Sequence, residues 1–192
     1  YGQPGNHKWI MVDIGVTFAD DTVPGVDLIY PDPGFIVERK ENLLGIVLTH
    51  AHEDHIGAIA HLWPKLKCKI YATPFKAILI KEKFKEKHID ITKDLKIVEL
   101  NGKVSLGAFE IEYITLTHSI LEPNGLRIQT PAGIILHTGD WKVDPNPLIG
   151  DEINSKRLKE IGDEGVLAMI CDSTNVFSEG RSGSELEVRK IY

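Results

Sequence analysis

Four side chains of the kinds that bind transition metals lie within six consecutive positions, directly after an apolar run. They are His50, His52, Asp54 and His55. Imidazole nitrogen and carboxylate oxygen are ligands that zinc and related divalent ions accept. A polar loop that happens to be rich in histidine does not account for so many ligand-type groups in so few positions. The segment therefore predicts a metal site, dense enough to form the floor of a site for two ions.

Three more ligand-type side chains each lie at the end of a predicted strand or just after it. They are Asp13, His118 and Asp140. In layered α/β folds, ligands collect in the loops at the ends of strands. We therefore expect these side chains to gather with the histidine segment at one edge of a sheet system.

The coordination chemistry of zinc suggests how these groups divide between two ions. A zinc ion binds about four to five ligands and keeps a position open for water. The expected first site consists of His50, His52 and His118, and the second of Asp54, His55 and Asp140. Asp140 is able to bridge the ions, and Asp13 suits a role in orienting an imidazole from behind. Two ions about 3.5–4 Å apart can share a hydroxide and activate it near neutral pH.

Other residue patterns that carry chemistry are weaker or missing from the sequence. His137 ends the predicted strand that precedes Asp140. It is equally well interpreted as a residue that orients a metal ligand or as a packing residue. His61 is expected on the surface. The sequence holds no Gly-x-Ser-x-Gly and no Gly-x-x-x-x-Gly-Lys, so neither a serine hydrolase nor a nucleoside triphosphatase is supported.

Alternating strands and helices must position these groups, which predicts a mixed α/β class. The predicted strands cover residues 9–13, 44–49, 69–72, 109–116, 126–130, 134–137 and 166–172, and the helices 56–63, 74–87, 155–161 and 184–192. Pro64 should end the first of these helices. Asn101-Gly102 should join residues 97–100 to a strand from Val104 as a hairpin, and residues 109–116 alternate as a half-buried strand does.

Composition limits the class of protein. The 42% hydrophobic and 26% charged residues are ordinary for a soluble globular domain, and no apolar stretch is long enough to cross a membrane. Two cysteines make no disulfide framework, so we expect a reducing, cytoplasmic setting with Cys171 buried. The net charge of −6 argues against a basic nucleic-acid-binding surface. Lysines over residues 76–87, Lys76 among them, are interpreted as a solvated helix face.

The order of the ligand-type residues resembles the metallo-β-lactamase superfamily, which implies an αββα fold. Longer strings resemble ribonuclease J in that superfamily. These strings are Asp13-Ile14-Gly15-Val16-Thr17-Phe18, Thr117-His118-Ser119-Ile120, His137-Thr138-Gly139-Asp140-Trp141-Lys142 and Asp172-Ser173-Thr174-Asn175. The last string resembles an acidic motif of the β-CASP branch, in which a second domain is inserted after it. The resemblance therefore implies a metallo-β-lactamase domain over residues 1–183 and the start of an inserted domain over 184–192.

The resemblance to ribonuclease J also implies an activity. It implies a hydrolase that cuts RNA phosphodiester bonds from the 5′ end, with internal cleavage left open, using two divalent ions, zinc or alternatively manganese. Asp54 would hold the hydroxide, and Asp172 would orient a ligand or move a proton. Ser119 would line the phosphate pocket, although a turn residue is an equally good interpretation. RNA is the implied partner, no membrane is expected, and homo-oligomerisation is left open.

One departure and two rival functions accompany this resemblance. The family's late metal-binding histidine lies beyond the inserted domain, so we expect an incomplete second site and an inactive fragment. A thioester or lactam hydrolase on the same scaffold shares the ligands. The string that begins at Asp172 and the expected continuation past Tyr192 argue against it. A non-enzymatic scaffold is not indicated, because all six ligand candidates are of ligand type.

Overall fold

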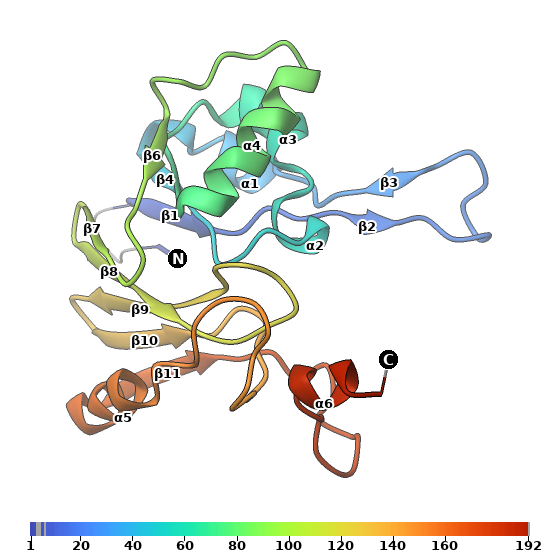
Figure 1. Cartoon of the computed structure of the whole chain (residues 1–192). Coiled ribbons are helices and arrows are strands. Elements are labelled where there is room, and N and C mark those ends of the chain that lie inside the picture. Colours follow the sequence, from blue (N-terminus) through green and yellow to red (C-terminus); the bar gives the residue numbers. More distant parts are fainter. Residues whose placement is uncertain (3–4, 6, 192) are drawn as a thin grey trace. The chain divides into compact units, whose positions relative to one another are not determined.

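Residues 1–2, 5 and 7–191 are described by a computed structural model, in which the chain divides into two units, Tyr1–Val98 and Glu99–Tyr192. Each unit contains a sheet of its own (Figure 1). The mixed α/β class expected from the sequence is confirmed. The predicted boundary at residues 183/184 stays a prediction.

The first unit is built on a four-stranded parallel sheet in the order β1-β4-β5-β6. Its strands are β1 (Trp9–Val12), β4 (Leu43–Val47), β5 (Ile70–Ala72) and β6 (Leu95–Ile97). Parallel strands need crossover connections, and helices supply them. These helices are α2 (Glu53–Ile56), α3 (Ile59–Leu66) and α4 (Pro74–Glu86). Ile46, Val47 and Leu48 are fully buried, so the strand that leads into the histidine segment is at the centre of the core.

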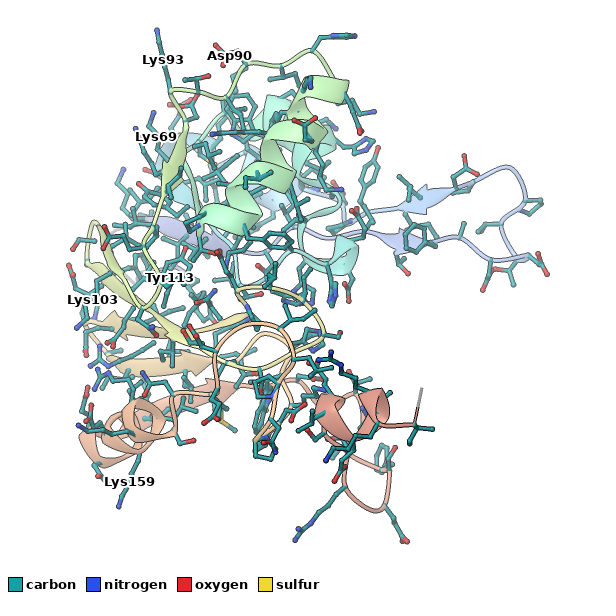
Figure 2. All side chains as sticks on the ribbon, in the orientation of Figure 1. Lys69, Asp90, Lys93, Lys103, Tyr113 and Lys159 are labelled. Carbon is teal, nitrogen blue, oxygen red and sulfur yellow. The ribbon has the colours of Figure 1, made fainter. Side chains whose placement is uncertain are left out.

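Smaller elements complete the first unit. They are β2 (Thr17–Phe18), β3 (Leu28–Ile29), α1 (Gly34–Val37) and a 3-10 turn (Lys40–Asn42). β2 and β3 pair as an antiparallel hairpin that extends away from the sheet of this unit (Figure 1). Figure 2 labels Lys69, whose ammonium pairs with Asp94 at 2.7 Å and donates to the Lys93 carbonyl oxygen at 3.0 Å. These bonds join the start of β5 to the start of β6.

The second unit is built on a five-stranded sheet in the order β11-β10-β9-β8-β7. Its strands are β7 (Lys103–Leu106), β8 (Phe109–Thr115), β9 (Asn124–Thr130), β10 (Gly133–His137) and β11 (Val166–Ile170), and its helices are α5 (Ser155–Glu164) and α6 (Glu185–Arg189). Neighbouring strands are antiparallel except β10 and β11, which α5 connects in parallel. Ile114, Ile134 and Ile161 pack together where α5 covers the sheet. Arg157 on α5 forms two hydrogen bonds to the Glu112 carboxylate on β8, at 2.7 and 2.8 Å.

The prediction that Pro64 ends a helix is wrong. The helix α3 continues through Pro64 to Leu66, where Lys67 ends it in the left-handed conformation with φ 49°. Proline removes one helical hydrogen bond. Burial of Ile59, Leu62, Trp63 and Leu66 along one face compensates, and Trp63 packs edge-to-face on Phe84 of α4 at 5.5 Å.

The predicted hairpin around Asn101-Gly102 is also wrong. β6 pairs in parallel with β5 in the first unit, whereas β7 pairs with β8 in the second. Asn101 does adopt a turn conformation with φ 56°, and its side chain accepts hydrogen bonds from Thr115. The turn therefore connects strands of two different sheets, because β6 pairs with β5 and β7 pairs with β8 rather than with each other.

Two burial predictions need correction. β8 is buried at six of its seven positions rather than alternating, because both of its faces are covered. Cys171 is exposed, not buried, and Cys68 is the buried cysteine. The cause is the position of β11 at the edge of its sheet, where Leu167, Met169 and Ile170 are also exposed.

Candidate metal centre

The histidine segment begins at the end of β4 and is held in place by residues 13–16, which follow β1. The Ile14 N–H donates to the His55 carbonyl oxygen at 2.7 Å, and the Val16 N–H donates to that of Glu53 at 3.0 Å. In return, the Ala58 N–H donates to the Ile14 carbonyl oxygen at 3.0 Å. Because β1 and β4 are neighbours in the sheet, the two segments leave it side by side. The backbone of α2 is thereby fixed by a segment about 40 residues earlier in the chain.

Gly15 allows this close approach of the two backbones. A Cβ atom at Gly15 would lie 1.6 Å from the Asp54 carbonyl oxygen and 2.1 Å from its carbonyl carbon. Both obstacles are backbone atoms, which no side-chain rotation relieves. Only glycine permits Asp54 and His55 to pack against the end of β1 in this way.

The Asp13 carboxylate binds three donors of the histidine segment. It accepts the Thr49 N–H at 2.8 Å, the Thr49 hydroxyl at 2.6 Å and His55 Nδ1 at 2.7 Å. A carboxylate can only accept, so His55 Nδ1 carries a proton and Nε2 carries the lone pair. Asp13 has φ 59°, a left-handed conformation that aspartate tolerates better than most residues.

A second histidine is oriented through the Thr49 hydroxyl. Because this hydroxyl gives its one proton to Asp13, its 3.1 Å contact with His50 Nδ1 requires the imidazole to donate. His50 Nε2 then carries the lone pair, as in His55. One carboxylate thus sets the tautomer of two imidazoles, which is how residues behind metal-binding histidines orient them.

The first unit brings its four candidate ligands into one cluster. The ring centroids of His50 and His55 are 3.9 Å apart, and those of His50 and His52 are 4.9 Å apart. Each of these pairs offers ligand atoms within 4.8 Å of each other. Asp54 Oδ2 lies 3.7 Å from His55 Nε2, and 64% of the Asp54 side chain is exposed. His50 is buried, so the cluster runs from the core to the surface.

The second unit contains the remaining ligand candidates, and it brings His118 and Asp140 together from separate strand ends. His118 Nε2 lies 3.9 Å from Asp140 Oδ2. Thr117 connects the two loops, because its hydroxyl and carbonyl oxygen both bond to the backbone of Lys142. The Asp144 N–H also donates to this hydroxyl, at 3.3 Å.

Asp172 lies beside this pair. The Asp172 N–H donates to the Thr138 hydroxyl at 3.1 Å, and that hydroxyl donates to the Gly139 carbonyl oxygen at 2.7 Å. The backbone and hydroxyl of Thr174 donate to Asp172 Oδ1 at 2.8 and 2.7 Å. These two hydrogen bonds from Thr174, with smaller effects from the Trp141 backbone and the charge of His118, hold the pKa of Asp172 below its usual value.

The donor set of each unit suits a divalent ion. The separation between His118 Nε2 and Asp140 Oδ2 is shorter than about 4.2 Å, twice a zinc–nitrogen bond, so one ion can reach both atoms. In the first unit, imidazoles in a fixed tautomer lie next to a carboxylate. These are the ligand types that zinc and manganese accept.

Two weaker predictions stay predictions. Ser119 is exposed directly after His118, and none of its contacts distinguishes a phosphate ligand from a turn residue. His137 is half-buried at the end of β10, between Leu126 on β9 and Ile170 on β11.

Sequence reasoning missed three residues of this centre and misplaced one. Gly15 and Thr138 lie in the strings that resemble ribonuclease J, and Thr49 ends a predicted strand, but none of the three was given a role. Lys76 was assigned to a solvated face, yet it is fully buried and its ammonium donates to the Thr49 carbonyl oxygen at 2.8 Å. A signal existed, because Lys76 precedes Ile80 and Phe84 by four and eight positions on the apolar stripe of α4.

Comparisons with known proteins agree with this arrangement. Residues 8–158 match the family model described as a beta-lactamase superfamily domain. Ribonuclease J of Sinorhizobium meliloti is 46% identical over 190 residues, which are 98% of this chain and 33% of that protein. Ribonuclease J of Helicobacter pylori is 41% identical over 184 residues, 95% of this chain and 27% of that protein. The chain thus spans about a third of the length of these relatives.

Solved structures share the fold at low sequence identity. A diphosphatase described as a new member of the PhnP family matches 97% of this chain and 64% of its own, with a TM-score of 0.58 at 15% identity. The metallo-beta-lactamase fold protein YhfI from Bacillus subtilis matches 74% of this chain and 54% of its own, with a TM-score of 0.50 at 18% identity. The expected metallo-β-lactamase fold is confirmed. Among the described residues, no helix has the length and apolar character needed to span a membrane.

Proposed function

Because the chain belongs to the beta-lactamase superfamily, we propose that it supplies the metal-binding part of a metal-dependent ribonuclease. The observation that carries this proposal is the division of ligands between two prepared groups. One group comprises His50, His52, Asp54 and His55, and the other comprises His118 and Asp140. Neither group alone offers enough ligands for two ions. Similarity to ribonuclease J over 98% of the chain supports RNA as the substrate class.

We assign the ligands as the sequence order suggests. His50, His52 and His118 would hold one ion, and Asp54, His55 and Asp140 the other, with Asp140 between them. When bound, two divalent ions neutralise phosphate charge and lower the pKa of water. We favour zinc, with manganese as the alternative that the ligand types also accept.

The residues of the chain have separate tasks in this proposal. Asp13 holds His50 and His55 with Nε2 presented to the ligand position. Asp54, exposed at the edge of the cluster, is available to take a proton from the attacking water. Asp172 has Oδ1 occupied by Thr174, which favours orienting His118 over carrying a proton. Ser119 would contact the substrate phosphate.

We further propose a cytoplasmic setting, in which RNA is the partner. The absence of a membrane-spanning helix among the described residues is consistent with that setting. Homo-oligomerisation stays open.

Hydrolysis assays on the protein that carries this chain test the proposal. It should degrade RNA with a 5′-monophosphate and leave a lactam and a thioester intact. Cleavage of the thioester or lactam while the RNA survives would refute the proposal and favour another hydrolase on this scaffold.

Ligand variants test the site assignment. His52→Ala or Asp54→Ala should abolish RNA cleavage, with the unfolding temperature little changed, because neither side chain packs in the core. The control is Glu82→Ala on the exposed face of α4, which should keep full activity. Near-normal cleavage by either ligand variant would show that the assignment is wrong.

Metal analysis tests the number of ions. The 192-residue chain should retain less than two equivalents of zinc or manganese after gel filtration, because the family's late histidine is not among its residues. Two tightly held ions per chain would contradict this expectation.

A further inference from the structure

Lys76 has an unusual environment for a lysine. It lies in the first turn of α4 and is 0% exposed to solvent. Burying an ammonium group is unfavourable unless polar partners compensate, and a cation near a helix N-terminus is also disfavoured by the helix dipole. Burial and the helix dipole both disfavour an ammonium group at this position. Its presence therefore indicates that it makes an interaction that an aliphatic side chain could not make.

The geometry of α4 explains how the side chain reaches the core. The buried residues of this helix are Lys76, Ala77, Ile80 and Phe84, a stripe with helical spacing. A leucine or methionine would be the ordinary residue at the first position of such a stripe. Lys76 instead extends its ammonium to the Thr49 carbonyl oxygen, at 2.8 Å.

Thr49 is the residue directly before the candidate ligand His50, and every polar group it has is bound. Its N–H and hydroxyl donate to Asp13, its hydroxyl also contacts His50 Nδ1, and its carbonyl oxygen accepts from Lys76. An anion after β1 and a cation on α4 therefore hold the same residue through different atoms. The carbonyl oxygen belongs to the Thr49–His50 peptide, so fixing it fixes the plane from which the His50 side chain departs.

We propose that Lys76 is a positioning residue, which holds the Thr49–His50 peptide and thereby the direction and tautomer of the His50 imidazole. The proposal rests on the proposed function only in treating His50 as a metal ligand. Lys76 contacts neither metal nor substrate in this role and acts through Thr49. Its contribution belongs to the metal-free protein, where the ring must already be oriented before an ion arrives.

Nitrogen NMR of the histidine rings in the metal-free chain tests the positioning step without any metal. In the wild type, His50 should show the tautomer with Nδ1 protonated. In Lys76→Met, which removes the donor and keeps a linear side chain, the His50 signals should move toward a mixture of tautomers. His88, which is exposed just past the end of α4, should keep its wild-type signals. An unchanged His50 spectrum in a folded Lys76→Met protein would overturn the proposal.

Titration with Co²⁺, followed by its visible absorption, tests the consequence for metal binding. Lys76→Met should weaken the first Co²⁺ binding step by about tenfold or more, the usual effect of removing a residue that orients a ligand. Lys81→Met is the matched control, because it makes the same change at an exposed position of the same helix and should bind as the wild type does. Lys76→Arg keeps a cationic donor and should recover most of the affinity. Equal losses in Lys76→Met and Lys76→Arg would indicate packing alone and refute the positioning role.

The proposal can still be tested if Lys76→Met does not fold or if the wild type binds no Co²⁺. If Lys76→Met does not fold, Lys76→Gln serves instead, because its side chain is about 1.5 Å shorter and cannot reach the carbonyl oxygen. It should change the His50 signals as Lys76→Met would. If the wild type binds no Co²⁺, the proposed function fails, while the ring spectra still test the role of Lys76.

Discussion

The two units prepare their candidate ligands in different ways. In the first unit, four ligands lie within six residues, and the backbone around them is fixed by contacts with residues 13–16 and with Lys76. In the second unit, His118, Asp140 and Asp172 come from three separate strand ends. There, the hydroxyls of Thr117 and Thr138 join the loops. A contiguous ligand set therefore depends on close backbone packing, whereas a dispersed set depends on threonine side chains.

The largest effect should follow from filling the space at Gly15. Gly15→Ala would place a Cβ 1.6 Å from the Asp54 carbonyl oxygen, so the backbone of one segment must move. We expect a loss of about 3 kcal/mol or more in the free energy of unfolding, with metal affinity lost as well. Urea denaturation and Co²⁺ titration would measure both.

Gly162→Ala is the control for Gly15→Ala. Gly162 lies inside α5, and a Cβ there meets nothing within 4 Å. This substitution should raise the free energy of unfolding by about 0.5–1 kcal/mol and leave metal affinity unchanged. If Gly15→Ala behaved like Gly162→Ala, close packing would not be what holds the first group of ligands.

A smaller effect should follow from Asp13→Asn. Asparagine tolerates the left-handed backbone conformation. Its amide nitrogen, however, cannot accept the hydrogen bonds that the second carboxylate oxygen of Asp13 receives. We expect metal affinity to fall by about 10–100-fold, the range for residues that orient ligands. Isothermal titration with Zn²⁺ would measure it. Asp20→Asn, in an exposed turn with Thr22, should bind normally, and equal affinities for the two variants would exclude the role of Asp13.

In the second unit, Thr138→Val should have a milder effect. It preserves shape but removes the hydroxyl that accepts the Asp172 N–H and donates to Gly139. We expect a cost of about 1 kcal/mol in the free energy of unfolding and a loss of less than about tenfold in metal affinity. Thr130→Val in the β9–β10 turn should lower the free energy of unfolding and leave metal affinity unchanged. If Thr130→Val changed metal affinity as much as Thr138→Val, the Thr138 hydroxyl would have no specific role in holding the ligands of the second unit.

The smallest effect concerns pH and the ion pair under the sheet of the second unit. Hydrogen bonds from Arg157, together with its charge and that of Lys103, hold the pKa of Glu112 below its usual value of 4.5, although burial opposes this. Because the folded pKa is the lower one, this stabilisation is fully present above pH 4.5 and is lost as the pH falls through the folded pKa. Melting temperatures measured from pH 7 downward should therefore fall less steeply below pH 4.5 in Glu112→Gln than in the wild type. Arg157→Gln should weaken the pH dependence of the melting temperature in the same way. If both variants kept the wild-type dependence below pH 4.5, the Glu112–Arg157 pair would not be its source.

Much of this arrangement was predictable from the sequence, for reasons that differ between residues. The strands before His50, His118 and Asp140 were predicted because apolar runs that end in polar clusters are local patterns. The continuation of α3 through Pro64 was not, since burial of Leu62, Trp63 and Leu66 outweighs a local rule. The separation of β6 from β7 also depends on long-range pairing. Lys76 was misplaced because residue type was considered before its position on the helical stripe.

The exposed edge strand β11 also makes the chain convenient for spectroscopy. Cys171 carries an accessible thiol next to Asp172, while burial raises the pKa of Cys68 to about 12 and leaves that thiol inert at neutral pH. A maleimide dye or nitroxide reagent will therefore attach at one position of the wild-type chain. A paramagnetic or fluorescent reporter can thus be installed beside Asp172 without first mutating a single residue.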